Sequence, residues 1–180
     1  MSSEAGLQIR QPIIAIVGWK NSGKTTLAVR LVEEFTARGL TIATIKHAHH
    51  SLRLDEEGTD SARHRAAGAK QVAVVSQKRW AIMTEGPEPD FIDVAAQLEP
   101  CDLILVEGYK SQPIPKIEAR RRESHPGAGF AERDDKVIAI AADYAIEGAK
   151  VPVFGLDDVS QIADYILAAL GMTGGAEQAS

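Results

Sequence analysis

The chain is nearly devoid of cysteine, and this scarcity restricts both its compartment and its chemistry. Cys101 is the single cysteine among 180 residues. One thiol cannot form a disulfide within the chain, and zinc sites built on cysteine pairs are excluded as well. These absences fit a reducing compartment, so we expect a cytoplasmic protein.

Long hydrophobic runs are also missing from the sequence. No apolar stretch approaches the roughly 18 residues that a membrane-spanning helix needs. The residues before Pro12 lack the apolar core of a signal peptide. We therefore expect no membrane partner. The net charge of −5 argues against a nucleic-acid partner, because nucleic-acid-binding domains usually carry a basic surface.

The sequence does contain apolar runs that alternate with amphipathic segments. The runs that predict strands lie at 12–17, 40–45, 71–76, 80–84, 102–106, 114–119, 137–142 and 151–154. The segments that predict helices lie at 25–38, 60–67, 91–98 and 158–170. We expect Asp60 to cap the second helix and Gly68 to end it. This alternation predicts an α/β fold with a mainly parallel sheet.

Residues Gly18–Thr25 read Gly-Trp-Lys-Asn-Ser-Gly-Lys-Thr and fit the phosphate-binding pattern G-x-x-x-x-G-K-[ST] at every fixed position. A buried strand is predicted before this segment and a helix after it, as phosphate binding by such a loop requires. The glycines let backbone N–H groups turn toward phosphate oxygens, and the helix start adds partial positive charge. We therefore expect a P-loop NTPase-type three-layer α/β/α fold.

Each residue of this loop is expected to take part in nucleotide binding: Gly18, Trp19, Lys20, Asn21, Ser22, Gly23, Lys24, Thr25 and, just beyond it, Thr26. Lys24 is the candidate catalytic cation, since it reaches the outer phosphates. Thr25 is a candidate Mg²⁺ ligand. Glu107 closes the apolar run 102–106, where parallel strands present their ligands, and is the candidate catalytic and metal-binding carboxylate.

Lys46 and His47 follow the second predicted strand at the same edge of the sheet, and His49 and His50 come next. Three close histidines suggest a transition-metal site, but no matching cysteine or carboxylate cluster accompanies them. Two interpretations remain open: Lys46 and His47 contact an anion, or the stretch is a solvated polar loop. Likewise, Arg120–Arg122 is either a solvated charge run or a surface that contacts an acidic partner.

The predicted domain organisation is simple, because no linker-like stretch interrupts the pattern. We expect an N-terminal extension over 1–11, one nucleotide-binding domain over 12–170 and a flexible tail over 171–180.

Several segments together resemble the MobB family, the molybdopterin-guanine dinucleotide biosynthesis protein B. They are the loop with its flanks at 14–26, Ile-Lys-His-Ala-His-His at 45–50, Asp60-Ser61 with 67–69, Asp-Leu-Ile-Leu-Val-Glu-Gly-Tyr-Lys at 102–110, Pro-Lys-Ile at 115–117 and Gly-Leu-Asp-Asp at 155–158. The resemblance covers nearly the whole chain. The segments at 45–50 and 102–110 are more selective than the loop itself.

The resemblance implies a homodimeric, GTP-binding accessory protein of molybdenum cofactor synthesis. Such a protein helps a molybdenum cofactor guanylyltransferase join GMP to molybdopterin, with at most slow GTP hydrolysis of its own. The chain lacks the Asn-Lys-x-Asp guanine motif of many GTPases, since its single asparagine is Asn21. Guanine preference therefore comes from the resemblance, with Asp143 as a candidate contact to the base.

Two other functions stay open from the residues. A small P-loop kinase would pass a phosphate to a metabolite, with Arg120–Arg122 in an arginine-bearing lid. A metal-insertion GTPase would use His47–His50 to load a metal, although the ligand spacing does not favour it. Lys110 and Lys116 are expected near Glu107, where they would add positive charge over an anion.

Overall fold

The computed structural model describes residues 9–48, 55–124 and 129–172. The chain divides into two compact units. We call Met1–His47 together with Phe91–Ser180 the main unit, and Ala48–Asp90 the small unit. Within the described ranges, no helix is long and apolar enough to cross a membrane. The single nucleotide-binding domain expected over 12–170 remains a prediction.

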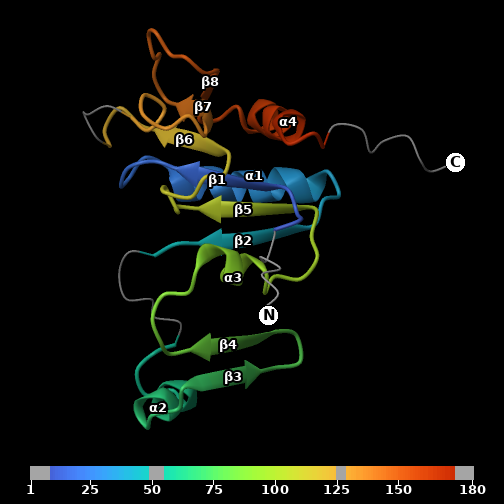
Figure 1. Cartoon of the computed structure of the whole chain (residues 1–180), viewed down its shortest axis with the longest axis vertical. Helices are drawn as coiled ribbons and strands as arrows, with labels where there is room; N and C mark the ends of the chain where they lie inside the picture. The colour runs from blue at the N-terminus through green and yellow to red at the C-terminus, as the bar shows by residue number, and fades with distance from the viewer. Residues whose placement is uncertain (1–8, 49–54, 125–128, 173–180) are drawn as a thin grey trace, which may run out of the picture. The chain divides into compact units, whose positions relative to one another are not determined.

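The main unit is built on a six-stranded sheet in the order β2-β5-β1-β6-β7-β8 (Figure 1). All neighbouring strands run parallel, which confirms the prediction. The strands are β1 (Ile13–Val17), β2 (Ile42–Lys46), β5 (Leu103–Glu107), β6 (Lys116–Arg120), β7 (Val137–Ala142) and β8 (Val153–Gly155). Strand β1 therefore has β5 on one side and β6 on the other.

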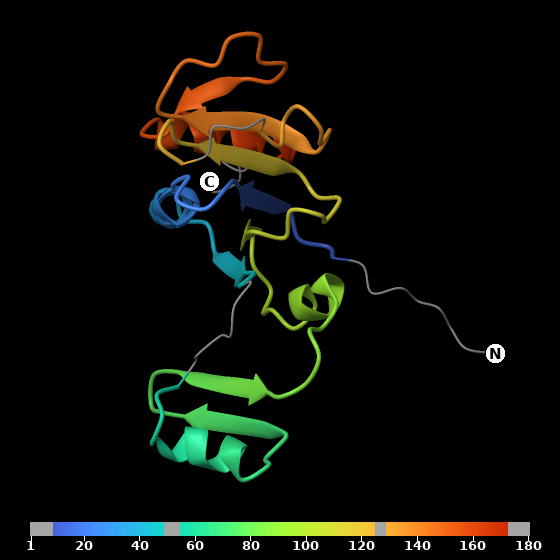
Figure 2. The same ribbon diagram turned by 90° about the vertical axis from the view of Figure 1, so that its left-hand side faces the viewer.

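Helices cover both faces of this sheet, because successive side chains of each strand point to opposite faces. Ile14 and Ile16 pack toward α1 (Lys24–Ala37) and α4 (Val159–Ala169), whereas Ala15 and Val17 lie in the cluster that includes α3 (Phe91–Ala95). Figure 2 shows α1 and α3 on opposite sides of the strands. The predicted three-layer α/β/α arrangement is confirmed.

Most predicted element positions are confirmed, with two differences in the main unit. The predicted helix 91–98 ends as an α-helix at Ala95. Strand β6 begins at Lys116, two residues after the start of the predicted strand 114–119, and lies directly beside β1. Lys116 at its start is 2% exposed and pairs with Asp134 over 3.0 Å. The expectation that Lys116 adds charge over an anion near Glu107 is therefore wrong.

The small unit contains α2 (Asp60–Ala66) and an antiparallel hairpin of β3 (Gln71–Val75) and β4 (Trp80–Thr84). The observed N-cap of α2 is Thr59, one residue before the predicted cap Asp60. Thr59 has extended backbone, and its hydroxyl accepts a hydrogen bond from the Ala62 N–H over 3.4 Å. Asp60 lies in the first helical turn, so its predicted capping role is wrong. Gly68 follows the helix with φ of 98°.

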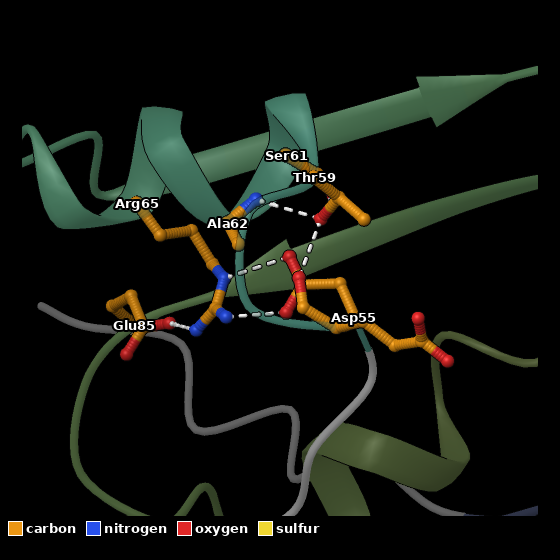
Figure 3. Close-up of polar contacts among 7 residues, drawn as sticks. Asp55, Thr59, Ser61, Ala62, Arg65 and Glu85 are labelled. Atoms are coloured by element: carbon orange, nitrogen blue, oxygen red, sulfur yellow. Dashed lines mark hydrogen bonds and ion pairs between the residues drawn. The ribbon is translucent and has the colours of Figure 1, made fainter.

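An ion-pair network joins the start of the small unit to its hairpin (Figure 3). Arg65 on α2 pairs with Asp55 on one side and with Glu85 on the other, the latter over 2.7 Å. The hydrogen bond from Arg65 lowers the pKa of Asp55. Arg65 is therefore a structural residue of this unit.

Candidate functional site

The loop after β1 depends on a glycine at its first position. Gly18 has φ of 154°, and a Cβ added there would lie 2.3 Å from Ser22 Oγ and 2.5 Å from the Ala119 carbonyl oxygen. No side chain fits into that space. The loop therefore folds tightly back on itself and rests on the backbone of β6.

Backbone geometry and internal hydrogen bonds hold the rest of the loop in its curved form. Asn21 and Gly23 have left-handed φ values of 64° and 89°; asparagine and glycine tolerate this region best. The Ser22 N–H and the Lys24 ammonium both donate to the Trp19 carbonyl, over 3.2 Å and 2.7 Å. Ser22 is 1% exposed, so its side chain belongs to the loop's interior.

Helix α1 begins directly at this loop, and its N-cap residue is a glycine without a side chain. Among the described residues no side chain accepts a hydrogen bond at this N-cap, Gly23, and the first turn carries no acidic residue. The first N–H groups of a helix have no partner within the helix and carry partial positive charge. This helix start is therefore suited to bind an anion.

Lys24 lies in a setting that disfavours its own charge. Burial lowers the pKa of Lys24, and Lys110 lowers it further, while Glu107 acts in the opposite direction. Lys46 adds a smaller lowering effect. Several cations thus converge on the loop, and among the described residues Glu107 is the carboxylate that acts against their effect on Lys24. A polyphosphate would supply further negative charge.

The two predicted metal-binding residues lie side by side. The Thr25 hydroxyl donates to Glu107 Oε1 over 2.7 Å. Lys46 is the neighbour of Glu107 across the β2–β5 pair, and its ammonium lies 3.1 Å from both carboxylate oxygens. Glu107 follows Val106 in alternation, so it points to the α1 face where Thr25 stands. Hydroxyl and carboxylate oxygens are ligands that suit Mg²⁺.

The other predicted residues at this edge have definite neighbours. The His47 ring stacks on Tyr109 at 4.4 Å, and the backbone N–H of His47 donates to the Glu107 carbonyl oxygen over 2.9 Å. Gly108 between them has φ of 95°, and a Cβ there would approach the His47 Cβ to 3.2 Å. His49 and His50 lie outside the described residues. Lys20 and Thr26 are exposed at the loop.

An aromatic and cationic cluster beside the loop was missed by the sequence reasoning. Trp19 packs on Phe130 with ring centroids 4.9 Å apart. The Lys110 ammonium lies 5.0 Å from both ring centroids, and the Arg133 guanidinium lies 5.6 Å and 5.1 Å from them. Phe130 is distant in sequence from the loop and has no motif around it, so no sequence signal identifies it.

The three consecutive arginines have three different environments. Arg120 is mostly buried and pairs with Glu118 and Glu132 over 2.8 Å and 2.9 Å, so it is not part of a solvated run. Arg122 lies over the Tyr144 ring at 5.2 Å. Arg121 lines a pocket of about 420 Å³ together with loop residues Asn21, Ser22, Gly23, Lys24, Thr25 and Thr26.

Asp143, the candidate contact to a base, has a backbone partner instead. Its carboxylate accepts a hydrogen bond from the Arg122 N–H over 2.9 Å. In this structure Asp143 therefore anchors the chain that leaves β6, next to the arginine in the pocket.

Comparison with known proteins agrees with this geometry. A family model described as MobB, molybdopterin guanine dinucleotide synthesis protein B, matches residues 13–143. The chain is 42% identical over 158 residues to the molybdopterin-guanine dinucleotide biosynthesis adapter protein of Haemophilus influenzae, covering 86% of this chain and 87% of that protein. It is 39% identical over 165 residues to the Escherichia coli protein of that name, covering 87% and 91%.

Solved structures give the same result. The crystal structure of Bacillus subtilis MobB matches with a TM-score of 0.69 at 30% identity, over 87% of this chain and 96% of that one. A MobB homologue from Bacillus stearothermophilus matches with a TM-score of 0.68 at 27% identity, over 88% and 97%. The residues matched by the family model, 13–143, include the phosphate-type loop and five of the six strands of the parallel sheet.

Proposed function

Since this chain belongs to the MobB family, we propose that it is a GTP-binding adapter in the biosynthesis of molybdopterin guanine dinucleotide, with at most slow GTP hydrolysis. The observation that carries the proposal is the curved loop at the uncapped start of α1, with Lys24 beside it. This arrangement presents N–H groups and an ammonium toward one pocket, which is the chemistry that a polyphosphate needs.

Thr25 and Glu107 are the residues that would hold Mg²⁺. Their oxygens are already in contact, and Glu107 already faces a cation, the Lys46 ammonium. A bound Mg²⁺ would neutralise phosphate charge. The chain's own residues then have separate tasks. The loop binds and orients the phosphates, Lys24 contributes positive charge, and Glu107 accepts the hydrogen bond that the Thr25 hydroxyl donates.

The proposed partners are a molybdenum cofactor guanylyltransferase and molybdopterin, in the reducing environment of the cytoplasm. The adapter names of the relatives support a partner enzyme. Lys110 and Arg133, which lie over aromatic rings beside the loop, are suited to an anionic group brought by that partner.

We also propose a homodimer, and the hairpin of the small unit supports it. Strands β3 and β4 form a sheet of their own, so each has an edge without a strand partner among the described residues. Large apolar side chains are exposed on both strands: Val74, Val75, Trp80 and Ile82. An isolated two-stranded hairpin is marginally stable in water, and exposed apolar patches often mark interfaces. Light scattering of the purified chain should give twice the monomer mass; a monomer would contradict this.

The binding proposal is tested by calorimetric titration of the full chain with GTP, GDP and ATP, with and without Mg²⁺. We expect GTP to bind and Lys24→Ala to abolish binding. Lys136→Ala is the matched control. Lys136 lies just before the start of β7, whereas the loop lies beyond the carboxyl end of β1, at the opposite ends of the parallel strands. If the wild-type protein binds no nucleoside triphosphate in the presence of Mg²⁺, the proposal is overturned.

The adapter role needs a second measurement. Adding the chain to a guanylyltransferase with GTP and molybdopterin should raise the yield of the dinucleotide, and Lys24→Ala should not. Transfer of a labelled γ-phosphate to a small-molecule acceptor would instead favour the kinase alternative.

A further inference from the structure

Two strands flank β1, and each ends with a different functional group beside the loop. On one side β5 ends at Glu107, which contacts Thr25 and Lys46. On the other side β6 ends at Arg120, so Arg121 is the first residue beyond it. The carboxyl ends of parallel strands lie at one edge of a sheet. The loop that follows β1 is therefore bordered by a carboxylate on one flank and by arginine on the other.

Arg121 reaches the loop from this second flank. It lines the same pocket as the loop residues and the first turn of α1. A Cβ added to Gly23 would lie 3.0 Å from Arg121 Nε and 3.5 Å from its Nη2. Arg121 is exposed, and among the described residues no carboxylate pairs with it. An unpaired guanidinium over a glycine of this loop has the chemistry to bind phosphate.

The residues on either side of Arg121 are firmly held. Arg120 pairs with Glu118, which is 0% exposed and also accepts hydrogen bonds from the Phe130 and Ala131 N–H groups. The Arg122 N–H donates to Asp143, which follows β7. Because the backbone is anchored before and after Arg121, its side chain starts from a fixed point beside the loop. Such preorganisation reduces the entropy lost on binding.

We propose that Arg121 is a second phosphate clamp, which binds the α- and β-phosphates of the nucleotide in the loop. The assignment rests on the proposed nucleotide-binding function. In such loops the backbone amides cradle the α- and β-phosphates, while the lysine and the metal ion serve the outer ones. Arg121 lies over the loop backbone at Gly23, on the flank of β1 opposite to Glu107. It is therefore expected to act on GDP as well as on GTP.

The test compares three variants of the full chain by titration with GTP and GDP, each with Mg²⁺ and with a chelator. Arg121→Ala should lower the affinity for both nucleotides by about 10- to 100-fold, as expected for lost hydrogen bonds to a charged group. Arg121→Lys should fall between, because a point charge cannot form the two-pronged contact. The effect of Mg²⁺ on affinity should stay as in the wild type.

Arg122→Ala is the matched control, since it removes the same charge one residue away and keeps the backbone bond to Asp143. It should bind nucleotide as the wild type does, and all variants should melt at the same temperature. Wild-type affinity in Arg121→Ala, a loss confined to GTP, or an equal loss in Arg122→Ala would each overturn the assignment while leaving nucleotide binding intact. Absence of binding in the wild type would overturn the proposed function and this assignment together.

Discussion

The Thr25 hydroxyl donates a hydrogen bond to the Glu107 carboxylate over 2.7 Å, although 82 positions separate the two residues in sequence. One stands at the start of α1 and the other at the end of β5, and the neighbouring strands β1 and β5 bring them together. Lys46 on β2 completes the group. The carboxylate is thereby directed toward a cation before any ligand arrives.

We predict that Glu107→Gln separates metal binding from nucleotide binding. The amide keeps an oxygen that can accept the Thr25 hydrogen bond but loses the charge that favours Mg²⁺. The gain in GTP affinity on adding Mg²⁺ should shrink by about 10- to 100-fold, in the range seen when groups around a metal are altered. Affinity measured in a chelator should change little. An unchanged Mg²⁺ dependence would remove Glu107 from the metal site.

We predict that Gly18→Ala eliminates nucleotide binding and lowers stability. A methyl group there would meet Ser22 Oγ and the Ala119 carbonyl at distances no real contact allows, so the loop must shift away from β6. Gly39→Ala is the matched control. Gly39 also has a left-handed φ, of 85°, but nothing lies within 4 Å of an added Cβ.

Gly39→Ala should therefore lower the unfolding free energy by about 1–2 kcal/mol, from backbone strain alone. This variant should keep full GTP affinity. Urea unfolding and GTP titration of both variants measure the two effects. Equal behaviour of the two variants would contradict the close packing at Gly18.

The ion pair between buried Lys116 and half-buried Asp134 predicts an acid-sensitive contribution to stability. Burial favours the protonated carboxyl, but hydrogen bonds from the Lys116 side chain and the Lys136 N–H prevail and lower the pKa of Asp134. The folded state therefore binds this proton less readily than the unfolded state. The resulting stability is fully present above the unfolded value of about 3.9 and is lost as pH falls through the folded pKa.

Asp134→Asn should remove this pH dependence below about pH 4 and cost about 3 kcal/mol at pH 7, because the Lys116 ammonium stays buried with the Gln112 carbonyl as its remaining partner. The double variant Lys116→Met with Asp134→Asn should recover most of that loss. Urea unfolding across pH 2 to 7 measures both. If the double variant is no more stable than Asp134→Asn alone, the unpaired Lys116 ammonium is not the cause of the lost stability.

We predict that the start of α2 depends on Thr59 rather than on Asp60. Thr59→Ala should destabilise the helix by about 1 kcal/mol, the usual cost of a lost N-cap. Asp60→Ala should cost about 0.3–0.5 kcal/mol, because this exposed acid interacts weakly, with the helix dipole and with Arg63 over 3.8 Å. Hydrogen exchange of the amides in α2 reports both changes. The reverse order would restore Asp60 as the cap.

The curved loop and the position of Glu107 and Lys46 beside it could be predicted because their signals are local. Glycines at fixed spacing, a buried strand before them and an amphipathic helix after them suffice to define a phosphate loop. Glu107 and Lys46 follow from one further rule, that parallel strands present their ligands at their carboxyl ends. Predicting the position of these two residues requires no knowledge of which strands are neighbours.

Arg121 and its supports could not be predicted, because they depend on the strand order. Strand β6 alternates Lys116, Glu118 and Arg120 with apolar residues, a pattern typical of a half-exposed strand. Its position between β1 and β7 leaves Lys116 and Glu118 buried and Arg120 mostly buried, and these side chains find partners in Asp134, Glu132 and backbone N–H groups. No local pattern in Arg120–Arg122 distinguishes the arginine in the pocket from its two neighbours.

The contact between Gly18 and the Ala119 carbonyl also constrains when the site can form during synthesis. The phosphate motif leaves the ribosome early, but β1 acquires both its neighbours only after β5 and β6 have emerged. A nascent chain that stops before Lys116 would carry the complete motif without the backbone on which it rests. Nucleotide capture should therefore begin late in translation, when the middle of the sheet has closed around its first strand.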